Sequence, residues 1–173
     1  MFSCPKRYDK SHESKCGKPP ECCPRYAKFH VKNENIAGHT VYCRSGDKHK
    51  WQKNIYIVLI CFDDQPDQII SFSKARDAEL DNEDHIKIIF DTYRDGRNGY
   101  IFAINPFGAR YDALVSFNGE FENQNWDGAW DAKTQINGNY WSAEIRIPVS
   151  TLTFRRGLDS WGFNIERRIQ RYQ

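Results

Sequence analysis

From residue 54 onward the chain alternates apolar and polar residues in short runs, which is the pattern of β-strands with one buried and one solvated face. Between residues 140 and 148 every second residue is apolar, from Trp141 to Ile147. Gly, Asn, Asp or Pro bounds each run, as is typical of strands joined by turns. The pattern predicts strands at 84–92, 99–105, 126–136, 140–148 and 161–169.

Two further features fix how these strands are arranged. The dipeptide Asn137-Gly138 separates two alternating runs and tolerates the positive φ angles of a tight turn, which predicts a hairpin. Residues 55–62 are apolar on both faces and are expected to form a strand in the interior. We therefore predict an all-β fold over residues 40–171, a two-sheet antiparallel β-sandwich of immunoglobulin-like or jelly-roll-like type.

Charge and cysteine divide the chain unevenly. Residues 1–53 contain 12 Lys and Arg against 5 Asp and Glu, whereas residues 54–173 contain 13 against 18. Five of the six cysteines lie in the first part, and the sixth, Cys61, falls in an apolar run that suggests a small buried hydrophobic residue. We expect a basic, Cys-rich extension over residues 1–38 and a sandwich domain over residues 39–173.

Three interpretations of the extension remain open. It could bind zinc, although the paired spacings of common zinc fingers are absent, or carry disulfides if the protein is exported. Its low apolar content favours a poorly structured tail. No nucleic-acid-binding motif accompanies its basic residues, so no nucleic-acid partner is predicted. The candidate zinc ligands are Cys16, Cys22, Cys23, His30 and His39.

The sequence contains no membrane-spanning run and no recognisable export signal. No apolar stretch approaches the roughly 18 residues needed to cross a bilayer as a helix, so we expect no direct membrane insertion. Residues 1–20 lack the apolar segment of a secretory signal, so the chain as written has no encoded route out of the cytoplasm.

The aromatic residues are the strongest functional signal. An indole can cover the C–H face of a sugar ring while neighbouring amides and carboxylates bind its hydroxyls. Trp126 and Trp130 lie four residues apart, so they share one face if the strand is regular, and five Asn, Gln and Asp residues surround them. Either indole could instead fill the core, as we expect for Trp141 and Trp161.

Four motifs occur in order between residues 54 and 171. They are the strand and acidic loop "NIYIVLICFDDQPDQI", Tyr-x-Phe-x-x-Asn-Pro-x-Gly, Trp-Asp-x-x-Trp and Glu-Ile-x-Ile-Pro. In combination they resemble the carbohydrate-binding family 9-like module found at the N-terminus of large bacterial outer-membrane proteins and in some glycoside hydrolases. The usual Asp-Gly-x-Leu-Asp-Glu-x-x-Trp opening of that family is absent before Thr40.

The resemblance implies a module that binds a polysaccharide or oligosaccharide, as a fragment or isolated domain of a larger exported protein involved in polysaccharide catabolism. The implied location is periplasmic or associated with the outer membrane. The alternatives are a sandwich that docks on a membrane barrel and binds no sugar, or an accessory domain of a glycoside hydrolase. Sugar-binding members place Arg and Asn beside paired aromatics, roles that Arg97, Asn98, Asn105 and Arg110 could fill here.

Catalysis and metal binding have little support in the sequence. No spacing identifies a pair of catalytic carboxylates, and no nucleophile lies in a recognisable motif, so we predict a protein that is not an enzyme. We expect no cofactor, with calcium as the one candidate, because loop carboxylates are available although no calcium-loop signature is present. Those carboxylates belong to Asp63, Asp64, Asp91 and Asp95.

Overall fold

The computed structural model describes residues 26–29, 39–44 and 54–173, and within them the chain forms two antiparallel sheets of five strands each. The first sheet has the order β1 (Tyr26–Phe29), β2 (His39–Arg44), β3 (Asn54–Phe62), β9 (Tyr140–Pro148) and β8 (Asp131–Asn137). The second has the order β10 (Gly162–Arg168), β4 (His85–Asp91), β5 (Gly99–Ile104), β6 (Arg110–Ser116) and β7 (Phe121–Asn123).

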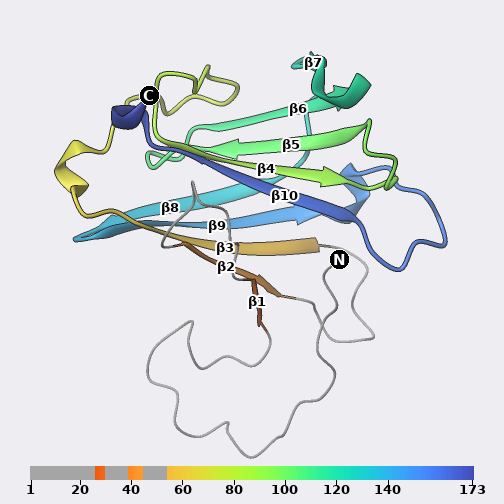
Figure 1. Cartoon of the computed structure of the whole chain (residues 1–173), viewed down its shortest axis with the longest axis horizontal. Coiled ribbons are helices and arrows are strands. Elements are labelled where there is room, and N and C mark those ends of the chain that lie inside the picture. Colours follow the sequence, from red (N-terminus) through yellow and green to blue (C-terminus); the bar gives the residue numbers. More distant parts are fainter. Residues whose placement is uncertain (1–25, 30–38, 45–53) are drawn as a thin grey trace, which may run out of the picture.

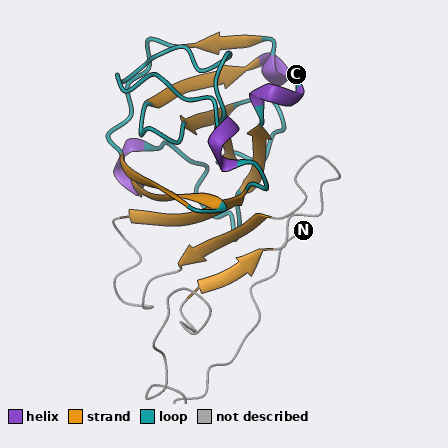
Figure 2. Cartoon of the chain, turned by 90° about the vertical axis from the view of Figure 1, so that its left-hand side faces the viewer, coloured by secondary structure: helices purple, strands orange, loops and turns teal. Residues whose placement is uncertain are grey.

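The sheets lie face to face, which confirms the predicted all-β sandwich (Figures 1 and 2). In the described residues the helical segments are short 3-10 turns, at Pro66–Gln68, Phe117–Gly119, Val149–Thr151 and Gln170–Tyr172. Strand β1 falls within the predicted 1–38 extension and pairs with β2, so the expected boundary between residues 38 and 39 separates two strands of one sheet.

Most predicted strand positions agree with the structure to within one residue. Strand β9 matches its predicted bounds, and β4, β5 and β10 differ from theirs by one residue at one or both ends. The prediction was wrong for β8, which begins at Asp131 rather than at Trp126. The Gly128 amide donates to the Asp112 carboxylate, and the Gly128 carbonyl oxygen accepts from Arg76. Side chains thus take the backbone hydrogen bonds that a neighbouring strand would otherwise make. Strand β6 was not predicted.

The β8–β9 hairpin is present, but its turn differs from the predicted one. The strands pair as far as Asn137 and Tyr140, so Gly138 and Asn139 are the central residues. Neither Asn137 nor Gly138 has a positive φ angle, and neither does Asn139. The hairpin is therefore confirmed, whereas the left-handed turn geometry inferred from the dipeptide is wrong.

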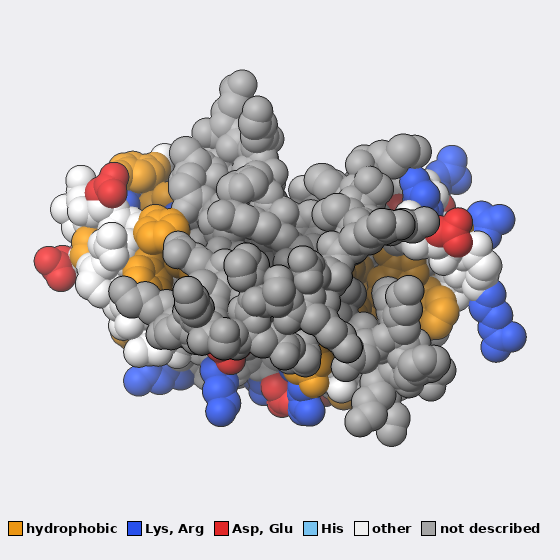
Figure 3. Space-filling model, turned by 90° about the horizontal axis from the view of Figure 1, so that it is seen from below, with side chains coloured by type: hydrophobic (Ala, Val, Ile, Leu, Met, Phe, Trp, Pro, Cys, Tyr) orange, Lys and Arg blue, Asp and Glu red, His pale blue; other side chains and the backbone are white. Residues whose placement is uncertain are grey.

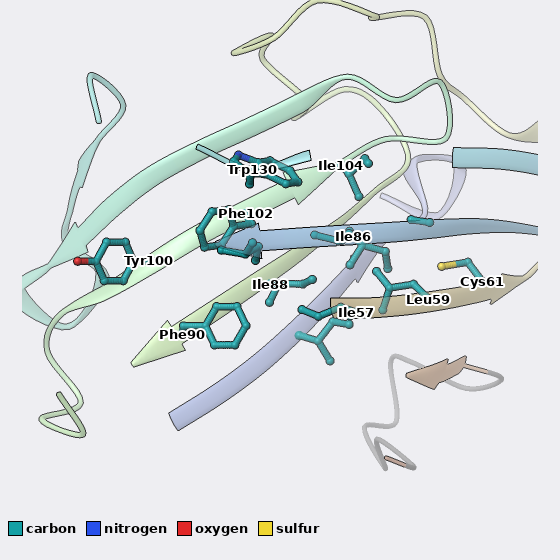
Figure 4. Packing of buried hydrophobic residues seen from close by; sticks show 14 of the residues in the cluster. Ile57, Leu59, Cys61, Ile86, Ile88, Phe90, Tyr100, Phe102, Ile104 and Trp130 are labelled. Atoms are coloured by element: carbon teal, nitrogen blue, oxygen red, sulfur yellow. The ribbon is translucent and has the colours of Figure 1, made fainter. Parts of the chain in front are cut away.

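Strand β3 lies between β2 and β9 in the first sheet, as its two apolar faces predicted. Its inward side chains, which include Ile57 and Leu59, pack against Ile88 of β4 and other residues of the second sheet (Figure 4). Cys61 belongs to the same cluster, and burial raises the pKa of its thiol to about 12 despite the nearby Arg167 charge. The Cys61 side chain is thus a buried apolar residue, as expected.

A buried carboxylate fixes the connection between β7 and β8. Asp112 of β6 is fully buried and accepts hydrogen bonds from the Gly128 amide at 2.6 Å and from the Trp130 indole at 2.8 Å. Arg76, from the β3–β4 connection, donates to the same carboxylate at 2.8 Å and also binds Asp127 and the Gly128 carbonyl oxygen. Three segments distant in sequence therefore meet at one side chain.

A second carboxylate ties down the C-terminal segment. Asp63 is buried and accepts two hydrogen bonds from Arg171, at 2.7 and 3.0 Å, and one from Arg167 at 3.3 Å. Burial raises the pKa of Asp63, but the hydrogen bonds from Arg171 and the Gln65 amide outweigh it and hold the pKa below its usual value. These contacts join the start of the β3–β4 connection to the end of β10.

Replacing Asp112 by Ala is expected to lower the free energy of unfolding by about 3 kcal/mol, because it leaves a buried indole N–H, a buried amide and a guanidinium without their acceptor. Urea denaturation measures the change. The matched control is Asp127→Ala, which removes an exposed partner of the same Arg76 and should cost less than about 1 kcal/mol. Equal losses in the two variants would contradict the central role of Asp112.

Replacing Arg171 by Met should give a pH-dependent loss of stability. The pKa of Asp63 is lowered in the folded state, so its contribution is present above the ordinary Asp pKa of about 4 and is lost as the pH falls through the folded-state value. We expect the variant to be less stable than the parent by about 3 kcal/mol at pH 7, and the difference to shrink below about pH 4. Denaturant unfolding from pH 7 to pH 2.5 tests this, and a difference that stays constant would contradict it.

Candidate functional site

The predicted platform residue Trp130 lies in the core. Only 3% of its surface is exposed, its ring centroid is 5.2 Å from that of Phe102, and its indole N–H donates to Asp112 (Figure 4). Its remaining face carries the Arg110 guanidinium, 5.5 Å from the ring centroid. Trp130 therefore offers no exposed face to a ligand, and the prediction that it forms a surface platform is wrong.

The other predicted platform, Trp126, is partly buried at the edge of the same core. Its ring centroid lies 4.9 Å from that of Tyr100 and 5.9 Å from that of Phe102. A Cβ atom at Gly128 would come within 2.7 Å of the indole, so glycine is required there for this packing. Residues 126–130 do not form a strand, but both indoles pack against Phe102 and therefore face the core rather than a ligand.

The predicted polar residues Asn105 and Arg110 serve structural roles at the β5–β6 turn. Asn105 is fully buried, its amide group donates to the Ser73 carbonyl and to Glu83, and its side-chain oxygen accepts from the Ala109 amide. Arg110 is partly buried over Trp130, donates to that residue's carbonyl oxygen and forms an ion pair with Asp131. An Asn105 so enclosed cannot bind a sugar hydroxyl, which corrects its assignment.

Arg97 and Asn98 are exposed, and they lie at the other end of the second sheet. They are in the β4–β5 loop, immediately before β5, whereas Asn105 and Arg110 follow that strand. At about 3.3 Å per residue, the six residues of β5 separate the two pairs by roughly 17 Å or more. The six predicted binding residues therefore do not form one site.

The candidate calcium ligands have other partners. The Asp91 carboxylate accepts hydrogen bonds from the amides of Tyr93, Asp95 and Gly96, and Asp95 caps the amides that follow it. Asp63 is bound by arginines, and Asp64 is exposed. No group of three potential metal ligands occurs in the part of the chain that the structure describes. Four of the zinc candidates lie outside the described residues, as does the side chain of the fifth, His39.

Three loops meet at the end of the sandwich that carries Arg97, and they form what we call the loop surface: residues 92–98, 117–120 and 153–161. All three lie at the right-hand end of Figure 1. Their anchor is a set of hydroxyl groups. The Thr92 hydroxyl donates to the Thr153 carbonyl at 2.7 Å, and the Tyr100 hydroxyl lies 2.7 Å from that of Thr153 and accepts from its amide.

Two further contacts hold the loops against one another. The Arg94 guanidinium donates to the Ser160 hydroxyl at 3.2 Å, and the Asn118 amide donates to the Arg97 carbonyl at 3.1 Å. Each of the three loops is thus bonded to at least one other. The positions of Arg97 and Asn98 are set further by Asp95, whose carboxylate accepts both of their amides and the Asn98 side-chain amide.

Three exposed aromatic side chains lie on this loop surface, and others, such as Phe72 and Tyr172, lie elsewhere on the described part of the chain. Tyr93 is 37% exposed, Phe154 is 42% exposed and Phe117 is 69% exposed. Phe154 stacks at 5.3 Å on Trp161, which packs in turn against the core. Figure 3 shows hydrophobic side chains at this end of the molecule, with Lys and Arg side chains beyond them.

The backbone at Phe117 is strained. Phe117, Asn118 and Gly119 have φ angles of 54°, 61° and 97°, so three successive residues are left-handed. This conformation is rare for a bulky residue and costs on the order of 1–3 kcal/mol. Burial of the ring offsets none of that cost, because most of it lies in solvent. Strained backbone positions of this kind cluster at ligand-binding sites.

Sequence reasoning located Arg97 and Asn98 but missed Tyr93 and Phe117. Both aromatics lie in turn segments, "TYRDGRNG" and "FNGE", where no alternation marks a side chain as exposed. The Asn118-Gly119 pair could have indicated a left-handed turn. Nothing in the sequence shows that this turn lies beside the β4–β5 loop.

Comparisons with known proteins give one structural similarity. No protein-family model matches the chain, and no curated protein matches it in sequence. The fold is similar to that of a Bacteroides uniformis protein, known from a crystal structure and described as a candidate carbohydrate-binding protein. The TM-score is 0.58 at 13% sequence identity, over 76% of this chain and 63% of that one. The chain thus spans less than two thirds of that protein, and the similarity establishes a shared fold.

Among the described residues, no helix has the length and apolar character needed to cross a membrane.

Replacing Asp95 by Ala should loosen the β4–β5 loop without unfolding the domain. The Arg97 backbone amide, followed by the side-chain and backbone amides of Asn98, holds the pKa of Asp95 below its usual value, and these donors would lose their acceptor. We expect faster hydrogen exchange at the two backbone amides, with the urea midpoint nearly unchanged because the loop is exposed. Unchanged exchange at both amides would show that Asp95 does not order the loop.

Proposed function

We propose that this chain is a carbohydrate-binding module and that its ligand contacts the loop surface. The observation that carries the proposal is the strained and exposed Phe117, whose neighbour Asn118 donates a backbone hydrogen bond to the Arg97 carbonyl oxygen. The similarity in fold to the Bacteroides uniformis protein supports binding of this general kind. Trp126, in contrast, packs from the core side on Tyr100, whose hydroxyl anchors the loop surface, and Trp130 lies in the core.

The chemistry of the loop surface fits a sugar. Phe117 and Tyr93 provide flat apolar faces for the C–H side of a pyranose ring. The exposed side chains of Arg97 and Asn98 lie in the loop bonded to that of Phe117 and can hydrogen-bond the hydroxyl groups around the ring. An open surface of this kind binds weakly, because it cannot enclose its ligand.

We further propose that the module belongs to the carbohydrate-binding family 9-like group and acts within a larger exported protein of polysaccharide catabolism, in the periplasm or at the outer membrane. The motifs between residues 54 and 171 support this assignment. We propose binding without catalysis, because no spacing in the sequence identifies a pair of catalytic carboxylates and no nucleophile lies in a recognisable motif. Docking on a membrane barrel is the alternative.

Replacing Phe117 by Ala is expected to weaken binding to a soluble polysaccharide about tenfold, equivalent to about 1.4 kcal/mol, through loss of the stacking face. Affinity electrophoresis in gels containing xylan, β-glucan or pectin measures the change. The matched control is Phe72→Ala, because Phe72 is 64% exposed but lies in the β3–β4 connection, outside the loop surface.

The controls separate the possible outcomes. Equal weakening by Phe117→Ala and Phe72→Ala would contradict a site on the loop surface. Failure of the parent protein to bind any member of a broad glycan panel would contradict carbohydrate binding and favour the docking role. Release of reducing sugar by the purified chain would contradict binding without catalysis.

A further inference from the structure

Charge is distributed unequally between the two ends of the sandwich. The β3–β4 connection, residues 63–84, contains eight Asp and Glu against two Lys and Arg. It enters β4 at the end opposite the β4–β5 loop. The loop surface instead contains four arginines against three carboxylates, namely Arg94, Arg97, Arg155 and Arg156 against Asp95, Glu120 and Asp159. Arg167 and Arg171 pair with Asp63 of the connection, so the difference between the ends is smaller than these counts, but an anionic ligand is still accepted more readily at the loop surface.

The loop surface also offers a ligand more hydrogen-bond donors than acceptors among its charged groups. The carboxylates of Asp91 and Asp95 each accept three hydrogen bonds from their own loop, which leaves them little capacity for a ligand. The guanidinium groups of Arg97, Arg155 and Arg156 are exposed and make no hydrogen bond within the described part of the chain. The carboxylates of Glu120 and Asp159 are also exposed, so the three guanidinium groups outnumber the carboxylates that are open to a ligand, and donors exceed acceptors among these charged groups.

A surface rich in donors selects ligands rich in acceptors. A neutral sugar hydroxyl is both a donor and an acceptor, so it gains from a site that offers both. A carboxylate only accepts, and a guanidinium binds it through two parallel, charge-assisted hydrogen bonds that are stronger than neutral ones. Arginines beside exposed aromatic rings therefore match a sugar ring that carries a carboxylate.

We propose that the loop surface binds an acidic glycan, a polysaccharide whose sugar rings carry carboxylate groups. This inference rests on the proposed function and specifies its ligand class. Phe117 and Tyr93 contact the ring faces, and Arg97 with Arg155 or Arg156 binds the carboxylates. Because the arginines are exposed, salt screens this attraction, so the affinity falls as ionic strength rises.

The test compares polygalacturonate with its fully methyl-esterified form, in which each carboxylate is replaced by an uncharged ester, by isothermal titration calorimetry with the whole chain. We expect the acidic polymer to bind at least tenfold more tightly in 20 mM salt, and this preference to be lost in 1 M salt. Arg97→Gln should reduce affinity for the acidic polymer at least fivefold and leave the melting temperature unchanged. The matched control is Lys133→Gln, an exposed cation on β8 of the first sheet, which should have no effect.

Each remaining outcome overturns the inference in a distinguishable way. Equal binding of both polymers, abolished by Phe117→Ala, would indicate a neutral glycan and leave the proposed function standing. Equal loss through Arg97→Gln and Lys133→Gln would indicate attraction to the overall charge of the protein. Binding to neither polymer would contradict the proposal of an acidic ligand. The broad glycan panel then decides whether the proposal of carbohydrate binding fails as well.

Discussion

The arrangement of this sandwich depends on the buried carboxylate of Asp112. A carboxylate enters a protein interior only where hydrogen bonds replace its hydration, and here an amide, an indole and a guanidinium supply them. These donors come from the β3–β4 connection and from the segment before β8, so one group positions both relative to β6. Trp130 is thereby held against Phe102 in the core.

Different parts of the chain cover the inward and the outward face of the second sheet. Alternation places Phe102 and Ile104 of β5 inward, whereas Ala103 on the outward face is covered by Leu80 and Ala78 of the β3–β4 connection. Strand β5 is consequently buried on both faces. The long connection is anchored there by Glu83, which is fully buried and binds the Phe72 and Ser73 amides and Asn105.

The sequence predicted the sandwich well and the binding residues poorly, for a physical reason. Strand positions follow from the local alternation of apolar and polar residues. The inward placement of Trp141 follows from its position in the alternating residues 140–148. Trp130 was misjudged because its burial depends on Asp112, eighteen residues away, which supplies a partner for the indole N–H. Asn105 was misjudged because Glu83 and Ser73, which enclose it, come from a connection whose path no local pattern encodes.

The loop surface has one property that its individual contacts do not show. Residues 153–161 connect the first sheet to the second, and their anchor joins Thr153 to Thr92 and Tyr100 of the second sheet. The geometry of the surface is therefore coupled to how the two sheets are aligned across the core. A ligand that requires this geometry would select one alignment of the sheets and raise the thermal stability of the whole sandwich through mass action. In this fold, ligand binding at the loop surface and the stability of the packing between the two sheets are therefore coupled.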